Sequence, residues 1–594
     1  MRVLQADISL RVAELLKNLV NAHRDYLPIN RELKKISGIV DFFTDRADYI
    51  DLKNDIKNFA LTVSDHNRIE YGDFQTPPDL SDNVCRYLAK KKIKPELVIE
   101  PTCGKGNFII SSLKHLKSVT AVYAVEIYKP YVWESKFNII NYYLQNPDEK
   151  KVSIHLFHEN IFDFDFIGLR RQLEKKEFLI VGNPPWVTNS TLSGLNSQNL
   201  PVKVNIKNHN GLDAITGKGN FDISEYISLK MLEHFSDKNG VMAFLIKNSV
   251  IRNIIRDLNR NKFKIGSLEK LNIDAKKEFN AFVDAALFYC RFNKEDAYAY
   301  RCKEKDFYKS SSKTRIFGWV DDKFVSDIER YAANKSYDRI SPLVWRSGHK
   351  HDCSRVMELK KSNGKYTNKL RETIELEEDL VFEFLKSSDL KRRIITNSQK
   401  FTIVTQRKIG QSTGYIKDNY PLTYKYLSAK EKFFLERKSS IYRNKPAFSI
   451  FGIGDYTFKK FKVAISGLYK DSMFSLIVPD NEKPILLDDT CYFLGFDSLS
   501  DAIYTFLLLN HHTTQDFLKS LVFLDDKRAY TKELLMRIDL VKIAENVSFD
   551  EIEKAADSSV PIYRDEVTEK TWERYIKMLT AEQAENAPVQ RSLF

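Results

Sequence analysis

The run with the most chemical content in this 594-residue chain is 179–186, which reads Leu-Ile-Val-Gly-Asn-Pro-Pro-Trp. Its apolar start predicts a strand, which the prolines must end because they fix φ and have no N–H for a ladder. A stiff loop then follows the carboxyl end of a strand, where open α/β sheets place their ligands. The loop holds the side-chain oxygen of Asn183, the carbonyl oxygen of Pro184 and the ring face of Trp186. Two acceptors beside an aromatic ring suit a flat heterocycle that carries an amino group.

The same run has a plain structural interpretation, in which a proline-stiffened loop is closed by a tryptophan that packs into the core. The loop alone does not separate the two interpretations, so the other motifs of the chain must decide.

A glycine-containing loop lies upstream, between a predicted strand at 97–100 and a predicted helix at 109–116. Gly104 and Gly106 allow a ligand to approach the backbone closely, and a phosphate-binding dinucleotide loop is one interpretation of such a pair. The loop lacks a third glycine, and it follows Glu100, which would repel a phosphate but attract an ammonium group. Glu126, at the end of the next predicted strand, is placed to accept hydrogen bonds from both hydroxyls of a ribose. A ribose and an ammonium group without a phosphate indicate S-adenosylmethionine.

A third motif is 75–78, Gln-Thr-Pro-Pro, which precedes a predicted helix that begins near Asp79. The N-terminal amides of a helix attract anions, so they could hold the carboxylate of the same cofactor. An ordinary helix cap with proline in the first turn is the alternative.

The elements that would position these motifs alternate between strands and helices from about residue 71. Strands are predicted at 97–100, 121–126, 152–157, 178–181, 241–246 and 285–292, and helices at 109–116 and 221–235. Such alternation implies an α/β fold with a doubly wound, mostly parallel sheet. Apolar residues at helical spacing predict an N-terminal helical extension over 1–70. The alternation fades near 300, which predicts an α+β domain at 301–578, with strand-like runs at 448–451 and 492–494, and a disordered polar tail at 579–594.

Composition narrows the classes of partner. The net charge of +13 and the pI near 9.0 favour a polyanion. No apolar run reaches the ~18 residues of a membrane span, and the N-terminus lacks a signal-peptide core, so no membrane partner is expected. The six cysteines are scattered without a CxxC pair, which favours a reducing cytoplasm. His349, His351 and Cys353 alternate, but this signal is too weak to predict a metal.

In this order, the motifs at 75–78, 99–108, 125–126 and 183–186 resemble those of the gamma-class, TaqI-type N6-adenine DNA methyltransferases of restriction–modification systems. The later runs at 219–222 and 247–249 also fit. The resemblance covers about residues 70–292 and implies a class I, Rossmann-like catalytic domain at 71–300 that uses S-adenosylmethionine. The cofactor-binding residues that it implies are Gln75, Thr76, Glu100, Pro101, Thr102, Gly104, Gly106, Glu126, Ile127, Asn160 and Ile161. The catalytic residues that it implies are Asn183, Pro184, Pro185 and Trp186.

Two positions depart from the family pattern. The usual acid at position 160 is the amide Asn160, which can still accept from an amino group but without the strength that a charge adds. Asp163 is the candidate replacement if the loop register differs. The fourth motif more commonly ends in Tyr or Phe, for which Trp186 is an adequate substitute.

The implied reaction is a direct methyl transfer without a metal. Asn183 Oδ1 and the Pro184 carbonyl would each accept one hydrogen of an adenine amino group, which aims its lone pair at the methyl group. The base must leave the duplex to reach this pocket, and Trp186 would stack on it. Phe279 is the first choice for the opposite face, with Phe282 behind it, although both could belong to the core.

The C-terminal domain resembles, less specifically, the target-recognition domains of that class, so double-stranded DNA is the expected partner. Basic residues alternate with aromatic ones there, and some should contact phosphates or base edges. The segments 351–352, 437–440 and 530–532 are similar to parts of such domains, without a role that the sequence assigns. A cognate restriction endonuclease is a candidate partner, and the terminal run Gln590–Phe594 resembles peptides that dock on bacterial sliding clamps.

Other functions share parts of this pattern. An N4-cytosine DNA methyltransferase needs the same polarisation of an amine, but that class favours Ser at the position of Asn183. RNA and protein amino-methyltransferases share the Asn-Pro-Pro-aromatic loop, although they seldom carry so large a basic C-terminal half. A bifunctional restriction–methylation enzyme would need a nuclease motif, and Glu32-Leu33-Lys34 is only a bare E-x-K on a predicted helix. A catalytically dead DNA-binding subunit is disfavoured by the intact Glu100, Glu126 and Asn183.

Overall fold

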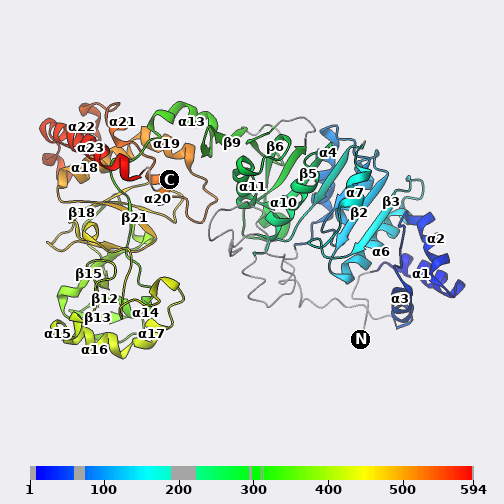
Figure 1. Ribbon diagram of the computed structural model, residues 1–594, viewed down its shortest axis with the longest axis horizontal. Coiled ribbons are helices and arrows are strands. Elements are labelled where there is room, and N and C mark those ends of the chain that lie inside the picture. Colours follow the sequence, from blue (N-terminus) through cyan, green and yellow to red (C-terminus); the bar gives the residue numbers. More distant parts are fainter. Residues whose placement is uncertain are drawn as a thin grey trace. The chain divides into compact units, whose positions relative to one another are not determined.

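The computed structural model describes residues 8–58, 74–174, 176–188, 222–292, 298–309, 311 and 313–590. The chain forms two compact units, Met1–Phe324 and Val325–Phe594, and Figure 1 shows the sheets and helices of each. The first unit extends past residue 300, where the sequence predicts the domain boundary. Three short strands beyond that point continue its sheet, and their partly exposed residues lack the apolar runs of the earlier strands.

One ten-stranded sheet, in the order β10-β9-β8-β6-β7-β5-β4-β1-β2-β3, forms the centre of the first unit. Its strands are β1 (Leu97–Glu100), β2 (Ala121–Glu126), β3 (Ser153–His158), β4 (Phe178–Gly182), β5 (Gly240–Lys247), β6 (Ile265–Ile273), β7 (Ala285–Phe292), β8 (Arg301–Asp306), β9 (Arg315–Val320) and β10 (Lys323–Val325). Neighbours among β1 to β5 are parallel, whereas β7 is antiparallel to β5 and β6. The prediction of a doubly wound, mostly parallel α/β sheet is confirmed for the strands that carry the motifs.

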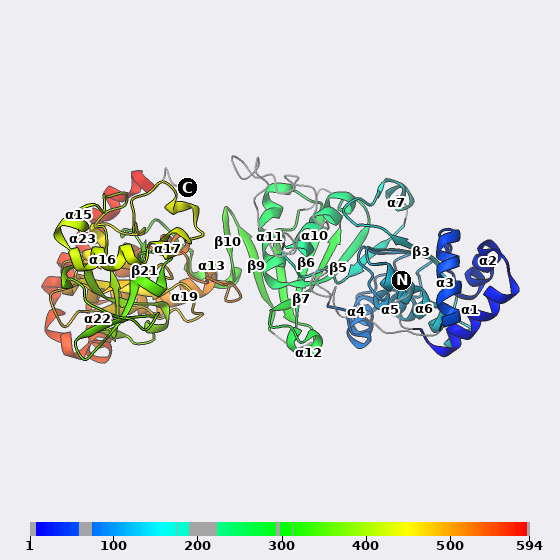
Figure 2. The same ribbon diagram turned by 90° about the horizontal axis from the view of Figure 1, so that it is seen from below.

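Helices cover both faces of this sheet. Figure 2 shows α4 (Pro78–Lys90), α5 (Asn107–His115) and α6 (Lys129–Gln145) on one face, and α7 (Ile167–Gln172), α10 (Ile223–Phe235) and α11 (Asn248–Asn261) on the other. All of β4 and all but the last residue of β5 are buried. Burial on both faces explains why these strands are continuous apolar runs in the sequence.

Three N-terminal helices, α1 (Leu10–Ala22), α2 (Tyr26–Ser37) and α3 (Arg46–Asn58), belong to the same compact unit. Their buried side chains share one hydrophobic core with the sheet and with α6. The Asn30 side chain bonds to both the N–H and the carbonyl of Phe43, each at 2.9 Å. Ile39 also forms a parallel bridge with Ile154 of β3. The predicted helical extension is therefore packed against the α/β fold.

The second unit holds two sheets with helices around them. The five-stranded sheet has the order β11-β21-β18-β19-β16, and the six-stranded sheet has the order β14-β13-β12-β17-β15-β20. The strands are β11 (Arg346–Ser347), β12 (Glu358–Ser362), β13 (Lys365–Asn368), β14 (Thr373–Ile374), β15 (Val381–Leu385), β16 (Ile394–Ile395), β17 (Lys400–Ile403), β18 (Phe461–Ser466), β19 (Ser475–Ile477), β20 (Leu486–Leu487) and β21 (Cys491–Phe496). The predicted strand-like run at 492–494 is part of β21. The run at 448–451 contributes only an isolated bridge at Phe451, because the left-handed φ of +59° at Phe448 interrupts an extended backbone.

The helices of the second unit are short before residue 499 and longer after it. They are α13 (Ile328–Asn334), α14 (Ser354–Met357), α15 (Tyr415–Asn419), α16 (Pro421–Ala429), α17 (Glu431–Leu435), α18 (Leu499–Asn510), α19 (His512–Leu521), α20 (Lys532–Leu535), α21 (Leu540–Ala544), α22 (Phe549–Ser559) and α23 (Glu569–Gln590). Helix α23 passes through most of the stretch predicted to be a disordered tail. That prediction was wrong as far as Gln590, because Tyr575 and Leu579 are fully buried and anchor the helix. Arg591–Phe594, the greater part of the predicted clamp-binding peptide, lie outside the described residues.

No helix in the described ranges has both the length and the apolar character needed to cross a bilayer. Within the same ranges, no group of three or more His, Cys, Asp or Glu side chains is arranged to hold a metal ion.

Candidate active site

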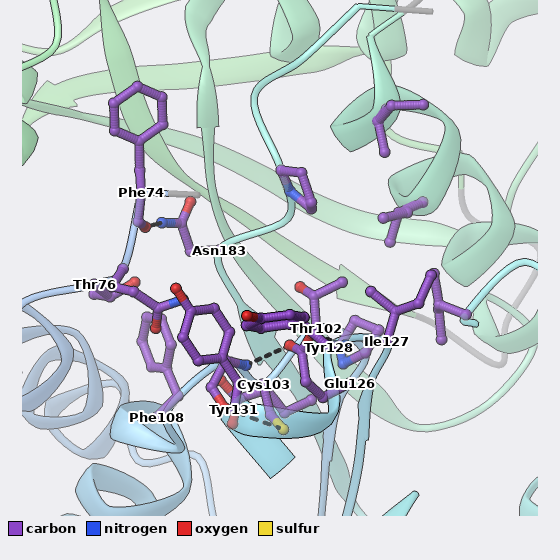
Figure 3. Close-up of a pocket in the computed structure, with 18 of the residues that line it drawn as sticks. Phe74, Thr76, Thr102, Cys103, Phe108, Glu126, Ile127, Tyr128, Tyr131 and Asn183 are labelled. Carbon is purple, nitrogen blue, oxygen red and sulfur yellow. Dashed lines mark hydrogen bonds between the residues drawn. The ribbon is translucent and has the colours of Figure 1, made fainter. Parts of the chain in front are cut away.

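A pocket lies at the carboxyl ends of β1, β2 and β4, where the sequence motifs meet (Figure 3). Its empty space, including the part open to solvent, is about 920 Å³. Of the predicted residues, its lining contains Gln75, Thr76, Glu100, Pro101, Thr102, Gly104, Glu126, Ile127, Asn160, Ile161, Asn183 and Pro185. Gly106, Pro184, Trp186 and Phe279 lie outside that lining.

The glycine loop turns sharply between β1 and α5. Gly104 has φ of +51° and Gly106 has φ of +80°, a left-handed conformation that side chains disfavour. A Cβ at Gly104 would collide with the Gln75 side chain, and a Cβ at Gly106 would collide with Ser135 of α6. Gly104 therefore shapes the pocket wall, whereas Gly106 lets the start of α5 pack closely against α6.

Glu126, the last residue of β2, is fixed by two backbone donors. The Gly104 N–H donates to its Oε2 and the Tyr128 N–H to its Oε1, both at 2.8 Å. Each carboxylate oxygen can accept more than one hydrogen bond. Glu126 is thus an oriented acceptor at the pocket wall.

Three buried polar atoms of the lining have no hydrogen-bond partner among the described residues. They are Glu100 Oε2, Thr102 Oγ1 and Asn183 Oδ1. Burial raises the pKa of the Glu100 carboxyl well above its usual range, and the nearby Glu126 raises it further. A cation bound beside Glu100 would offset both effects.

The segment before α4 folds over the glycine loop. The Gln75 side chain accepts from the Lys105 N–H at 3.2 Å, and the Thr76 carbonyl accepts from Asn107 Nδ2 at 2.7 Å. The helix itself begins at Pro78 with Pro77 as the capping residue, which makes no side-chain cap. Thr76 is therefore not the ordinary N-cap that the sequence left open, and its buried side chain lines the pocket instead.

Asn160 lines the pocket, and Asp163 is not part of the lining. The Asn160 Oδ1 accepts from the Phe162 N–H at 3.0 Å, which closes a tight turn after β3. This turn sets Ile161 and Phe162 against the pocket. The Asn160 side chain thus shapes the loop by accepting a hydrogen bond from the loop's own backbone.

The Asn183 side chain has a defined orientation. Its Nδ2 donates to the carbonyl of Phe74 at 2.7 Å, a contact drawn in Figure 3. Because that carbonyl can only accept, the amide nitrogen must face it and Oδ1 must face away. Oδ1 is then left as an unpaired acceptor of a residue in the pocket lining.

Trp186 is held in an aromatic cluster. Its Nε1 donates to the Leu245 carbonyl at 3.2 Å, and only 6% of the residue is exposed. Its ring centroid lies 5.3 Å from that of Phe74 and 5.1 Å from that of Phe279. The Trp186 and Phe279 rings meet at 67°, so they touch edge to face in this structure.

A partly buried ion pair contacts the same loop. Lys247, at the end of β5, pairs with Asp222 and donates to the Trp186 carbonyl at 3.2 Å. Asp222 also caps α10 by accepting from the Ser224 N–H at 3.1 Å. One lysine therefore connects the loop after β4, the end of β5 and the start of α10. Of the predicted run 219–222, only Asp222 is among the described residues.

Several lining residues were not predicted from the sequence: Phe74, Cys103, Asn107, Phe108, Tyr128, Tyr131, Glu159, Phe162, Val187, Ile223 and Ile227. Most are direct neighbours of the motifs, so extending each motif by one or two residues would have found them. Ile223 and Ile227 are four residues apart on a predicted helix, a spacing that indicates one shared face.

Comparison with known proteins places this geometry in a family. A family model described as N-6 DNA Methylase matches residues 50–280. The chain is 40% identical over 478 residues to the type II methyltransferase M.NspV of Nostoc sp., an alignment that covers 80% of this chain and 98% of that protein. The chain belongs to the N-6 DNA methylase family. It is therefore a DNA methyltransferase, and S-adenosylmethionine is its cofactor.

Two further similarities are more distant. The type II methyltransferase M.VspI of Vibrio sp. is 25% identical over 197 residues, which are 33% of this methyltransferase and 41% of that protein. The structure of the type IIL restriction–modification enzyme MmeI in complex with DNA superposes with a TM-score of 0.54 at 11% identity. That similarity covers 96% of this chain and 91% of that chain, and it confirms the fold.

The pocket fits S-adenosylmethionine on its own chemistry. It contains a buried carboxyl group whose charged form a cation would stabilise, an oriented acceptor at Glu126 and a sharp glycine turn. Among the described residues, its lining contains no lysine or arginine side chain for a phosphate.

Proposed function

We propose that this methyltransferase modifies the N6 amino group of an adenine that has been flipped out of duplex DNA. The observation that carries the proposal is the unpaired, oriented Oδ1 of Asn183 in the pocket lining. The bound cofactor supplies an electrophilic methyl group on a sulfonium.

The cofactor roles follow from the chemistry of the lining. Glu100 would hold the ammonium group, and the amides at the start of α4, behind Thr76, would attract the carboxylate. Glu126 would accept from the ribose hydroxyls. Ile127 and Ile161 would contact the adenine ring of the cofactor, and Asn160 would keep Ile161 in place.

Asn183 and Pro184 would activate the target amine. The exocyclic nitrogen of adenine is a poor nucleophile because its lone pair is delocalised into the ring. Asn183 Oδ1 and the Pro184 carbonyl would each accept one hydrogen, which localises the lone pair and directs it at the methyl group. The nitrogen is cationic after transfer and releases one proton to water, so neither acceptor has to become ionised.

The aromatic cluster would receive the base. Trp186 is fixed by its bond to Leu245, so it is a rigid surface for stacking. Phe279 lies on the five-residue helix α12 (Ala275–Phe279) and touches Trp186 directly. Entry of a base between the two rings therefore requires α12 to move aside.

The biological role that we propose is protection of DNA within a restriction–modification system, alongside a cognate endonuclease. It is supported by the 40% identity to a type II methyltransferase over nearly all of that relative. The net charge of +13 also suits double-stranded DNA as the substrate.

The test is to incubate the full-length protein with methyl-labelled cofactor and unmethylated duplex DNA, then digest the DNA to nucleosides. The label should appear in N6-methyl-2′-deoxyadenosine. Label in N4-methylcytosine would overturn the adenine assignment, and label in protein or RNA alone would overturn the DNA substrate.

A further inference from the structure

Two segments of the second unit without an assigned role, 351–352 and 437–440, meet at one cleft. It lies beside the ends of β15 and β20, and its lining includes Lys350, Asp352, Glu358, Arg437, Lys438 and Asp489. Residues from four separate parts of the sequence thus converge on one surface feature of this unit.

The floor of the cleft is made of two neutral histidines. His349 and His351 are 1% and 7% exposed, and burial lowers the pKa of each to about 3. His351 Nδ1 accepts from the Cys353 N–H at 3.0 Å, and His349 Nε2 lies 3.1 Å from Thr402 Oγ1. A hydrogen bond with the backbone of Leu487 acts on the His349 ring as well. Both histidines are therefore fixed by the protein around them.

The loop above this floor is rigidly held. Lys350 exchanges two backbone hydrogen bonds with Phe451, at 2.8 and 2.9 Å, and its carbonyl also accepts from the Tyr442 hydroxyl at 3.2 Å. Arg437 donates to the carbonyls of His351 and Ser449, at 3.2 and 2.7 Å, and stacks on the Tyr442 ring. The Arg437 guanidinium is therefore used in holding the loop, and Arg437 acts as a positioning residue for Lys350 and Asp352.

The side chains that this loop presents are Lys350 and Asp352. Both side chains are 33% exposed, and Lys350 Nζ lies 3.5 Å from Asp352 Oδ2. Asp352 adopts a left-handed φ of +48°, a conformation that is unusual outside glycine and is enriched at functional sites. A cationic donor and an anionic acceptor are thus held side by side at the cleft.

This pair matches one edge of DNA. In the major groove, a G·C pair presents the O6 and N7 acceptors of guanine next to the N4 amino donor of cytosine. An A·T pair also presents an amino donor, at adenine N6, beside an acceptor, at thymine O4, but lysine pairs most often with the two acceptors of guanine and aspartate with the N4 amino group of cytosine. A phosphate is a poor match, because the lining has five acidic side chains and four basic ones.

We propose that this cleft reads a G·C base pair of the recognition sequence. Lys350 donates to guanine and Asp352 accepts from the amino group of cytosine, while Arg437 and the two histidines hold the loop. This inference rests on the proposed function, because it takes duplex DNA as the substrate.

The test begins by expressing the full-length protein in a host without DNA methylation and sequencing the methylated sites. Methylation rates are then measured on duplexes in which each base pair of that site is replaced in turn. Wild type, Lys350→Met and Asp352→Asn are compared. Each variant should lose about 10- to 100-fold of its discrimination at one G·C position and keep it at all others.

Lys460→Gln is the matched control, since Lys460 is equally exposed, pairs with Glu482 at 2.8 Å and does not line the cleft. It should leave the discrimination profile unchanged. Unchanged profiles in both cleft variants, an equal loss of rate on every duplex, or a recognition site without a G·C pair would overturn the proposal. Absence of methylation by wild type would instead overturn the proposed function.

Discussion

Glu100 and Asn183 each have a buried oxygen without a hydrogen-bond partner in the part of the chain that the structure describes. Leaving a buried polar atom unpaired costs about 1–3 kcal/mol, so their retention indicates a ligand that pairs with them. A cation would pair with Glu100, and a hydrogen-bond donor would pair with Asn183. At the scale of single residues, these two atoms support the proposed pairing of Glu100 with the ammonium group of the cofactor and of Asn183 with a target amine.

We expect Glu100→Gln to stabilise the cofactor-free protein and to weaken cofactor binding. The pKa of Glu100 is raised in the folded state, so its protonated form stabilises the fold below the unfolded pKa. That contribution is lost as pH rises through the folded pKa, where burying the charge costs free energy. The advantage of the glutamine variant in melting temperature should therefore grow as pH rises above 4.5, the ordinary pKa of a glutamate.

Thermal melts from pH 4 to 8, with and without S-adenosylmethionine, check this prediction. A variant that melts like wild type at every pH, or that binds the cofactor equally well by calorimetry, would contradict it.

At the scale of elements, the loop after β4 depends on its neighbours. Lys247 of β5 bonds to the Trp186 carbonyl, Leu245 of β5 accepts from the indole, and Phe74 accepts from Asn183. The prolines stiffen the loop from within, and these three contacts fix it from outside.

We expect Lys247→Met to reduce methyl transfer about 10- to 100-fold, because small displacements of reacting groups have effects of that size. Cofactor affinity should stay within about twofold, since Lys247 does not line the pocket. The measurement is single-turnover transfer together with cofactor binding, at a temperature where the variant is folded.

Lys270→Met is the control, because Lys270 also forms a buried ion pair, with Glu304 at 2.8 Å, but lies on β6 away from the pocket. It should lower the melting temperature and leave the transfer rate unchanged. Equal loss of rate in both variants would show that Lys247 acts only through stability.

The sequence predicted β1 and β2 to the residue, because each is a run of three or five apolar residues that ends at a glutamate, which leaves little freedom. It also predicted twelve of the 23 residues that line the pocket, mainly where a motif follows the end of a strand. It missed Phe74, because this residue orients Asn183 through its backbone carbonyl, a group that every residue has and that gives no signal in the sequence. It missed the contact of Lys247 with Trp186 because the two residues are 61 positions apart and meet only through strand pairing. The short strands β8 to β10 were missed because sheet edges lack the continuous apolar pattern.

At the scale of the whole molecule, the chain combines a catalytic unit with a second unit and carries a net charge of +13. DNA binding should therefore weaken steeply with salt, by about 10³-fold between 50 and 200 mM if some six phosphates are neutralised. Cofactor binding should change by less than about threefold, since a buried site is screened much less. Titrations of both ligands across that range check this, and a salt-independent affinity for DNA would contradict it.

We propose that Asn183 acts on the target amine and not on the cofactor. The most direct measurement is single-turnover methyl transfer by Asn183→Ala at saturating cofactor and DNA, paired with calorimetry of cofactor binding. The expected result is a loss of rate of at least about 100-fold, comparable to removing one key polar group from an active site, with cofactor affinity within about twofold of wild type. Retention of substantial transfer, or a loss explained by weaker cofactor binding, would contradict the claim.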